Sequence, residues 1–107
     1  MKAIAIHPIP TSFRLRRRKW AVRRAASHKR PYGGITVHAA KSIVIYDAAR
    51  KRKQTDHDKQ KTFWHEGTHA ILMTMEHKLA YDEAFVTQFG LLLEELIRTA
   101  RFEGAEE

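Results

Sequence analysis

The chain has 107 residues, of which 43% are hydrophobic, and a formal net charge of +8 at pH 7. This length predicts one domain with a modest core, and the composition excludes disorder along the whole chain. The absence of cysteine excludes disulfides, thiolate metal sites and cysteine nucleophiles, and no apolar run is long enough to span a membrane. We therefore expect a single domain, residues 1–107, in the cytoplasm.

The charge is divided unevenly along the chain. Residues 1–60 carry 16 Lys/Arg and 3 Asp/Glu, whereas residues 61–107 carry 4 Lys/Arg and 9 Asp/Glu. Such a basic half predicts an anionic partner, although a solvated basic surface explains the same composition. We therefore divide the domain into a basic N-terminal segment, residues 1–32, and a core, residues 33–101, which contains the motif described below.

The first elements in chain order are predicted strands. Residues 1–10 contain Pro8 and Pro10, so we expect an extended segment that is too short and too broken for a signal peptide. Residues 13–22 alternate apolar and basic side chains, the pattern of a strand pair with a basic turn; a helix over residues 13–26 is the competing interpretation. After a loop, residues 34–47 predict a β-hairpin, and residues 48–59 are expected to form a loop or a frayed lead-in to the next helix.

From about Lys59 the apolar period changes from that of a strand to that of a helix. One helix is predicted from Lys59 to Met75, and a second runs from Asp82, its N-cap, to about Arg101. The predicted fold class is α+β: a small, mainly antiparallel sheet packs on the first helix, and the C-terminal helix closes the other side of the site. The expected main core consists of Phe63, Leu72, Phe85, Phe89, Leu92 and Leu96.

The first helix carries the pattern His-Glu-x-x-His at His65, Glu66 and His69. Residues four apart lie one above the other on a helix face, so both imidazoles can reach one metal ion. Glu66 lies off that row, where it can act as the general base on a metal-bound water that attacks a carbonyl. The spacing therefore predicts one zinc ion; two solvent-facing histidines on an ordinary helix are the alternative.

A catalytic zinc ion usually has three protein ligands, so a third must come from elsewhere. We favour Glu83, which would project from the first turn of the second helix on the row of Val86 and Gly90. Gly90 would permit a close approach of the two helices. Asp82 is a less favoured ligand because it is better explained as the N-cap, and the alternative role of Glu83 is to stabilise the helix dipole.

Other polar residues offer weaker candidates. His77 and Tyr81, between the two helices, could donate a hydrogen bond to an oxyanion, but we favour ordinary loop roles for them. His38 and Tyr32 would line the cleft only if the hairpin borders it. Surface or turn positions are expected for the remaining histidines, which lack a partner at helical spacing: His7, His28 and His57.

The basic N-terminal segment suggests a second kind of partner. Its cations surround Trp20, an arrangement typical of a phosphate-binding patch with one stacking aromatic. The alternative is a strand with an apolar inner face and solvated arginines outside, and an acidic protein could also dock on this charge. The cations are Arg14, Arg16, Arg17, Arg18, Lys19, Arg23 and Arg24.

Two stretches around the motif resemble a known family. Residues 62–72 read Thr-Phe-Trp-His-Glu-Gly-Thr-His-Ala-Ile-Leu, and residues 82–86 read Asp-Glu-Ala-Phe-Val. They look like small phage and prophage HExxH proteins, which are similar in plan to minimal gluzincins (minigluzincins) and to the ImmA/IrrE-like metallopeptidase core. The resemblance, over residues 33–97, implies a zinc hydrolase with ligands His65, His69 and Glu83 and the base Glu66, in the host cytoplasm if phage-encoded.

Three functions remain in competition. The first is a zinc-dependent peptidase acting on a peptide or protein substrate, and it is favoured by Glu66, because a purely structural zinc site needs no base. The second is a zinc-stabilised, non-catalytic accessory protein that binds a host protein, which suits the small size of the chain. The third is a nucleic-acid-associated protein with a structural zinc ion, which rests on the basic N-terminal segment alone.

Overall fold

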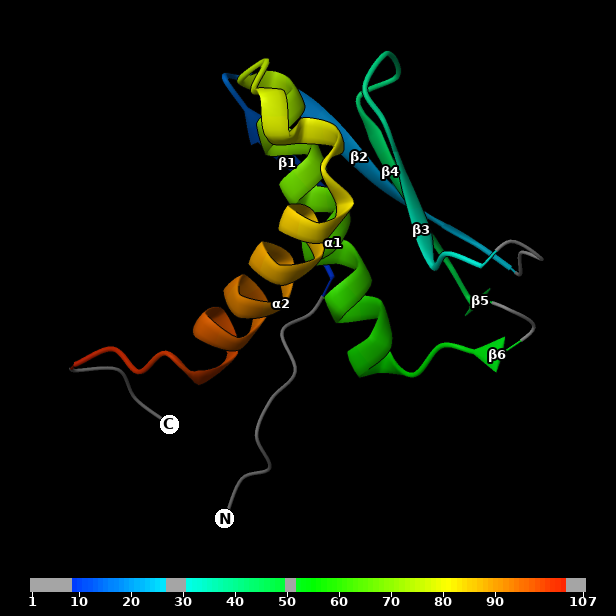
Figure 1. Cartoon of the computed structure of the whole chain (residues 1–107). Coiled ribbons are helices and arrows are strands. Elements are labelled where there is room, and N and C mark those ends of the chain that lie inside the picture. The colour runs from blue at the N-terminus through cyan, green and yellow to red at the C-terminus, as the bar shows by residue number, and fades with distance from the viewer. Residues whose placement is uncertain (1–8, 27–30, 50–51, 104–107) are drawn as a thin grey trace.

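A computed structural model describes residues 9–26, 31–49 and 52–103. The fold is α+β, as predicted: a small sheet lies against one long helix, and a second helix packs beside the first (Figure 1). The elements in chain order are β1 (Ser12–Leu15), β2 (Arg18–Ala25), β3 (Gly34–Val37), β4 (Ser42–Tyr46), β5 (Ala48–Ala49), β6 (Arg52–Lys53), α1 (Asp56–Thr74), the 3₁₀ helix η1 (Lys78–Tyr81) and α2 (Glu83–Thr99).

The main sheet has the strand order β1-β2-β4-β3. Strands β1 and β2 form one antiparallel hairpin, β3 and β4 form another, and β2 joins them by pairing with β4 in parallel. Both hairpins confirm the alternating patterns of the sequence, so the alternative helix over residues 13–26 is wrong. In this strand order β3 is an edge strand, and no other strand within the described residues pairs with its outer side.

One face of the sheet packs on α1 and forms the core. Trp20, Ile43 and Ile45 are completely buried on this inner face, and Phe63 packs against them from α1. Side chains alternate along a strand, so the neighbours of these residues point to the opposite, outer face. The packing therefore leaves α1 and the motif it carries on one side of the sheet.

Helix α1 begins earlier than the periodicity predicted. Thr55 accepts a hydrogen bond from the backbone N of Asp58 at 3.0 Å, and Asp58 accepts one from the N of Thr55 at 3.1 Å, which together form a capping box. These hydrogen bonds from Thr55 hold the pKa of Asp58 below its usual range. The predicted loop over residues 48–59 thus contains β5, β6 and the start of α1, because capping chemistry rather than apolar period sets this helix end.

The predicted main core is wrong for the second helix. Phe63 and Leu72 are buried, but Phe89, Leu92 and Leu96 are 45%, 59% and 63% exposed. Helix α2 packs instead through a neighbouring row of buried residues, Val86, Gly90 and Glu94. An apolar stripe at helical spacing marks one face of a helix, but it does not determine which face a small chain can cover.

Within residues 9–26, 31–49 and 52–103, neither the length nor the apolar character of any helix suffices for crossing a bilayer.

Gly67 gives a test of how α1 is packed. It lies within the helix, and a Cβ placed there would meet no atom within 4 Å. Because glycine is a poor helix former, Gly67→Ala should stabilise the protein by about 1 kcal/mol. The midpoint of urea unfolding measures this gain, and a lower midpoint than that of the parent would contradict the open environment of Gly67.

Candidate metal site

The residues predicted as metal ligands lie together where α1 meets α2. The Nε2 atom of His65 is 3.1 Å from Oε1 of Glu83, and the Nε2 atom of His69 is 3.0 Å from Oε2 of Glu83. One ligand atom from each of the three residues lies within 4.8 Å of the others. Ligand atoms on a tetrahedral zinc ion, with bonds of about 2.0–2.1 Å, are roughly 3.4 Å apart, so this donor set fits one ion.

Gly90 allows α2 to approach α1 closely enough for this grouping. A Cβ at Gly90 would lie 3.0 Å from the Cα and 3.2 Å from the N of His65. Val86, completely buried, lies one turn before Gly90, and Glu83 lies at the start of the same row. Asp82 is the N-cap of α2, since its Oδ1 accepts a hydrogen bond from the N of Phe85 at 3.0 Å. The backbone contact at Gly90 therefore brings Glu83 over the two histidines.

The connector between the helices orients His69. Its Nδ1 atom lies 2.7 Å from the carbonyl oxygen of Ala80, in a buried position. A carbonyl only accepts, so Nδ1 donates the hydrogen, and Nε2 is the nitrogen that faces Glu83. An imidazole lone pair and a carboxylate 3.0 Å apart repel unless a proton or a metal ion lies between them. The backbone thus fixes one nitrogen of His69, as is usual for a metal-ligating histidine, and directs Nε2 to Glu83, where either a proton or a metal ion can lie between the two.

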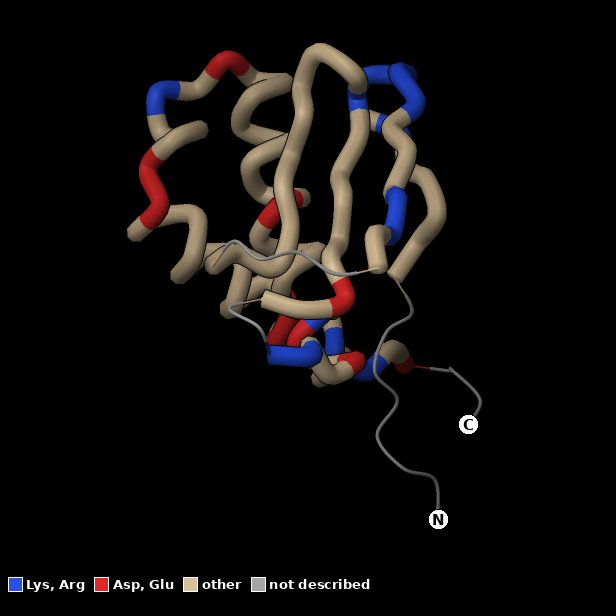
Figure 2. Tube along the Cα trace, turned by 90° about the vertical axis from the view of Figure 1, so that its right-hand side faces the viewer, with Lys and Arg blue, Asp and Glu red and all other residues tan. Residues whose placement is uncertain are grey.

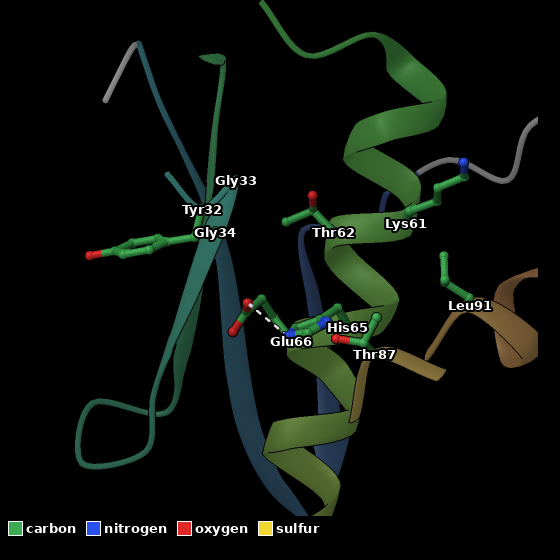
Figure 3. Close-up of a pocket in the computed structure, with 9 residues that line it drawn as sticks. All are labelled: Tyr32, Gly33, Gly34, Lys61, Thr62, His65, Glu66, Thr87 and Leu91. Atoms are coloured by element: carbon green, nitrogen blue, oxygen red, sulfur yellow. Dashed lines mark ion pairs between the residues drawn. The ribbon is translucent and has the colours of Figure 1, made fainter. Parts of the chain in front are cut away.

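Glu66 lies beside this donor set without belonging to it. Its side chain is buried, and Oε1 accepts a hydrogen bond of 2.7 Å from the hydroxyl of Thr36. Its other oxygen, Oε2, lies 4.0 Å from Nε2 of His65, as the dashed line in Figure 3 marks. One carboxylate oxygen is thus fixed by the sheet, and the other faces the ligand group.

Strand β3 contributes a site residue that the sequence analysis missed. Gly34 and Thr36 both face α1: a Cβ at Gly34 would lie 2.7 Å from Cγ2 of Thr62 and 3.4 Å from Cγ of Glu66. The missing side chain of Gly34 lets the strand lie close to the helix, and Thr36 reaches Glu66 from this position. The period of two in residues 34–37 placed Thr36 on a strand face, but no local signal indicates which helix residue that face meets.

Two cavities open beside the ligand group along β3. One has a volume of about 380 Å³ and is lined by all the motif residues together with Glu83, Thr36 and Tyr81. The other, about 210 Å³, lies between β3, α1 and α2 and is drawn in Figure 3. Because His65 and Glu66 line both cavities, the candidate base and one ligand lie between two spaces that run beside an edge strand.

The fold gives the weaker polar candidates from the sequence different roles. Tyr81 and Tyr32 line the larger cavity, whereas Nδ1 of His77 accepts a hydrogen bond from the N of Leu79 at 3.0 Å and thereby caps η1. His38 lies away from the site, with its ring edge against Trp20. His57 is 3.4 Å from Glu94, and His7 and His28 lie outside the described residues.

Comparisons with known proteins do not identify the chain. No protein-family model matches it, and neither a curated protein nor a solved structure is significantly similar to it. The chemistry of the site therefore has to be argued from the donor set and its geometry.

Proposed function

We propose that this protein is a zinc-dependent peptidase in which His65, His69 and Glu83 hold the ion and Glu66 is the general base. The observation that carries the proposal is the position of Glu66, buried and fixed by Thr36 beside a donor set to which it does not belong. A structural zinc site has no use for such a carboxylate. The resemblance of residues 62–72 and 82–86 to small phage HExxH proteins supports the same assignment. The location that we propose is the cytoplasm, that of the host if the chain is phage-encoded.

The proposed substrate is an extended peptide. Strand β3 is an edge strand, and an extended chain can add to such an edge through backbone hydrogen bonds. A peptide bound there would run past Glu66, and its side chains would enter the two cavities that flank His65. The edge strand thus supplies a sequence-tolerant backbone contact, and the cavities supply selectivity.

The chain's own residues account for the proton transfers. Zinc, when bound at such a site, supplies a Lewis acid and makes a bound water more acidic. Glu66 takes a proton from the attacking water and returns it to the leaving amine. The hydroxyl of Thr36 holds Oε1 of Glu66, so that Oε2 remains directed to the ligand side. Thr36 is therefore a positioning residue in this proposal.

The test separates hydrolysis from metal binding. Zinc-loaded parent protein and Glu66→Gln are incubated with a peptide library, and cleavage is followed by mass spectrometry beside zinc content. Glu66→Gln should keep its zinc and lower the cleavage rate at least about 100-fold, because it removes only the base. Loss of zinc from this variant would make Glu66 a ligand instead. A fully loaded parent that cleaves no peptide would favour the alternative, a non-catalytic zinc-stabilised accessory protein.

A further inference from the structure

The outer face of the sheet is strongly basic along β1 and β2. Residues 1–46 contain 11 Lys/Arg and no Asp or Glu. The strand registers place Arg14 opposite Lys19 and Arg23 opposite Val44, on the face away from Trp20 and Ile43. Arg17 lies in the turn between the strands, and Figure 2 shows the blue of Lys and Arg gathered at this end of the sheet. We define the outer basic face as four exposed cations: Arg14, Arg17, Lys19 and Arg23.

These four cations pair with no carboxylate in the part of the chain that the structure describes. Among the described residues, the Lys and Arg side chains that pair with a carboxylate are Lys59 and Arg98, and no member of the outer basic face has one within 4.0 Å. The guanidinium of Arg14 donates instead to the carbonyl oxygen of Arg17 at 3.3 Å. Like charges this dense repel one another, so their clustering is most readily explained by an external anion.

The two-residue turn of the β1–β2 hairpin carries arginines at positions where asparagine or glycine would be less strained. Arg16 and Arg17 have φ values of 50° and 69°. Two-residue hairpin turns of this kind favour Asn and Gly, because a positive φ costs other residues roughly 1–2 kcal/mol each. Hairpin stability alone therefore does not account for arginine at these two positions.

The chemistry of this face favours nucleic acid over an acidic protein. The other outer residues of β1 and β2 are small: Ser12, Ala21 and Ala25. Protein interfaces depend on large apolar or aromatic anchors at their centre, whereas nucleic-acid interfaces are polar and strongly positive. On β1 and β2 the outer face consists of cations separated by small residues, which matches the second description, and the apolar residues Val44 and Ile35 continue this face on β4 and β3.

The aromatic side chain that the sequence pattern marked for base stacking does not reach this face. Trp20, which the sequence pattern marked as a stacking aromatic, is completely buried and its ring packs on Phe13 at a centroid distance of 5.8 Å. Single-strand binding depends on aromatic side chains that stack on exposed bases. The cations are therefore suited to phosphates presented by a duplex, in which the bases are already stacked.

We propose that the outer basic face binds the phosphate backbone of double-stranded nucleic acid with little sequence preference. The face points away from α1, so binding there leaves the candidate metal site accessible. This inference does not rest on the proposed peptidase activity. Together the two proposals describe a protein that carries its zinc site on one side of the sheet and a duplex on the other.

The test compares two variants with the same net charge. A fluorescent 20-base-pair DNA duplex is titrated with the full chain, and anisotropy is measured between about 50 and 200 mM salt. One variant is Arg14→Gln/Lys19→Gln/Arg23→Gln, and its control removes three exposed cations elsewhere: Arg52→Gln/Lys78→Gln/Arg101→Gln. The first should bind at least about tenfold more weakly. The slope of its log affinity against log salt concentration should become shallower by about 0.9 for each lost phosphate contact. The control should bind like the parent.

Further arms identify what the face recognises. Arg14→Lys/Arg23→Lys keeps the charge and should retain both affinity and salt slope. Zinc content should be unchanged in every variant. Equal weakening of both triple variants, tighter binding of the single strand than of the duplex, or displacement by poly-glutamate at equal charge concentration would each overturn the proposal.

Discussion

Replacing His69 with alanine should abolish zinc binding at the α1–α2 contact. The expected parent value is about one zinc per chain, and loss of one of three protein ligands should lower zinc affinity at least about 100-fold. Glu83→Ala should have a comparable effect, because Glu83 reaches both histidines, at 3.1 Å and 3.0 Å. Elemental analysis after dialysis against a weak chelator measures the retained metal.

Matched controls separate the site from general metal affinity. His38→Ala removes a histidine that lies against Trp20, away from the site, and Glu95→Ala removes an exposed acid from the same helix as Glu83. Both should retain zinc at the parent level. Full retention of zinc in His69→Ala would show that the ion, if bound, is held elsewhere.

A leucine at Gly90 should disrupt both the helix pair and the metal site. Its Cβ would lie 3.0 Å from Cα of His65 and 3.2 Å from its N, so α2 has to move away from α1. Overpacking of this kind destabilises a protein by about 1–3 kcal/mol, even though leucine is the better helix former. The shift should also carry Glu83 away from the histidines. The midpoint of urea unfolding and the zinc affinity should therefore both be lower than in the parent.

Gly67→Leu provides the same substitution on the partner helix. A Cβ at Gly67 meets nothing within 4 Å, and an apolar cavity of about 490 Å³ lies beside it, lined in part by Phe13, Phe63 and Trp64. This variant should remain at least as stable as the parent and keep its zinc. If Gly90→Leu proved equally stable and equally loaded, the close helix contact would not be what positions Glu83.

Much of the local structure follows from periodicity. Alternation around Trp20 and along residues 34–46 predicted the two hairpins, and the helical spacing around Phe63 predicted α1. The motif itself requires only that His65 and His69 share a helix face, which follows from their separation. Even the role of Asp82 as N-cap follows from its position before an apolar-periodic segment.

The features that escaped prediction depend on contacts between distant segments. Thr36 meets Glu66 because β3 is the edge strand beside α1, a consequence of the parallel pairing of β2 with β4 that no local pattern indicates. The exposed Phe89, Leu92 and Leu96 misled the core prediction because α2 packs through Gly90, whose contribution is an absent side chain. Hydrophobicity identifies large side chains; it does not identify close backbone contacts.

The way α2 is attached gives the candidate metal ion a mechanical role. The helix packs mainly on α1 and η1, and several of its largest apolar side chains face solvent rather than the core. An ion held by His65, His69 and Glu83 would cross-link the two helices and close the chain segment between His69 and Glu83 into a loop, much as a disulfide does. In a chain without cysteine, the same atoms that form the proposed reaction centre would also restrain local unfolding of its last helix.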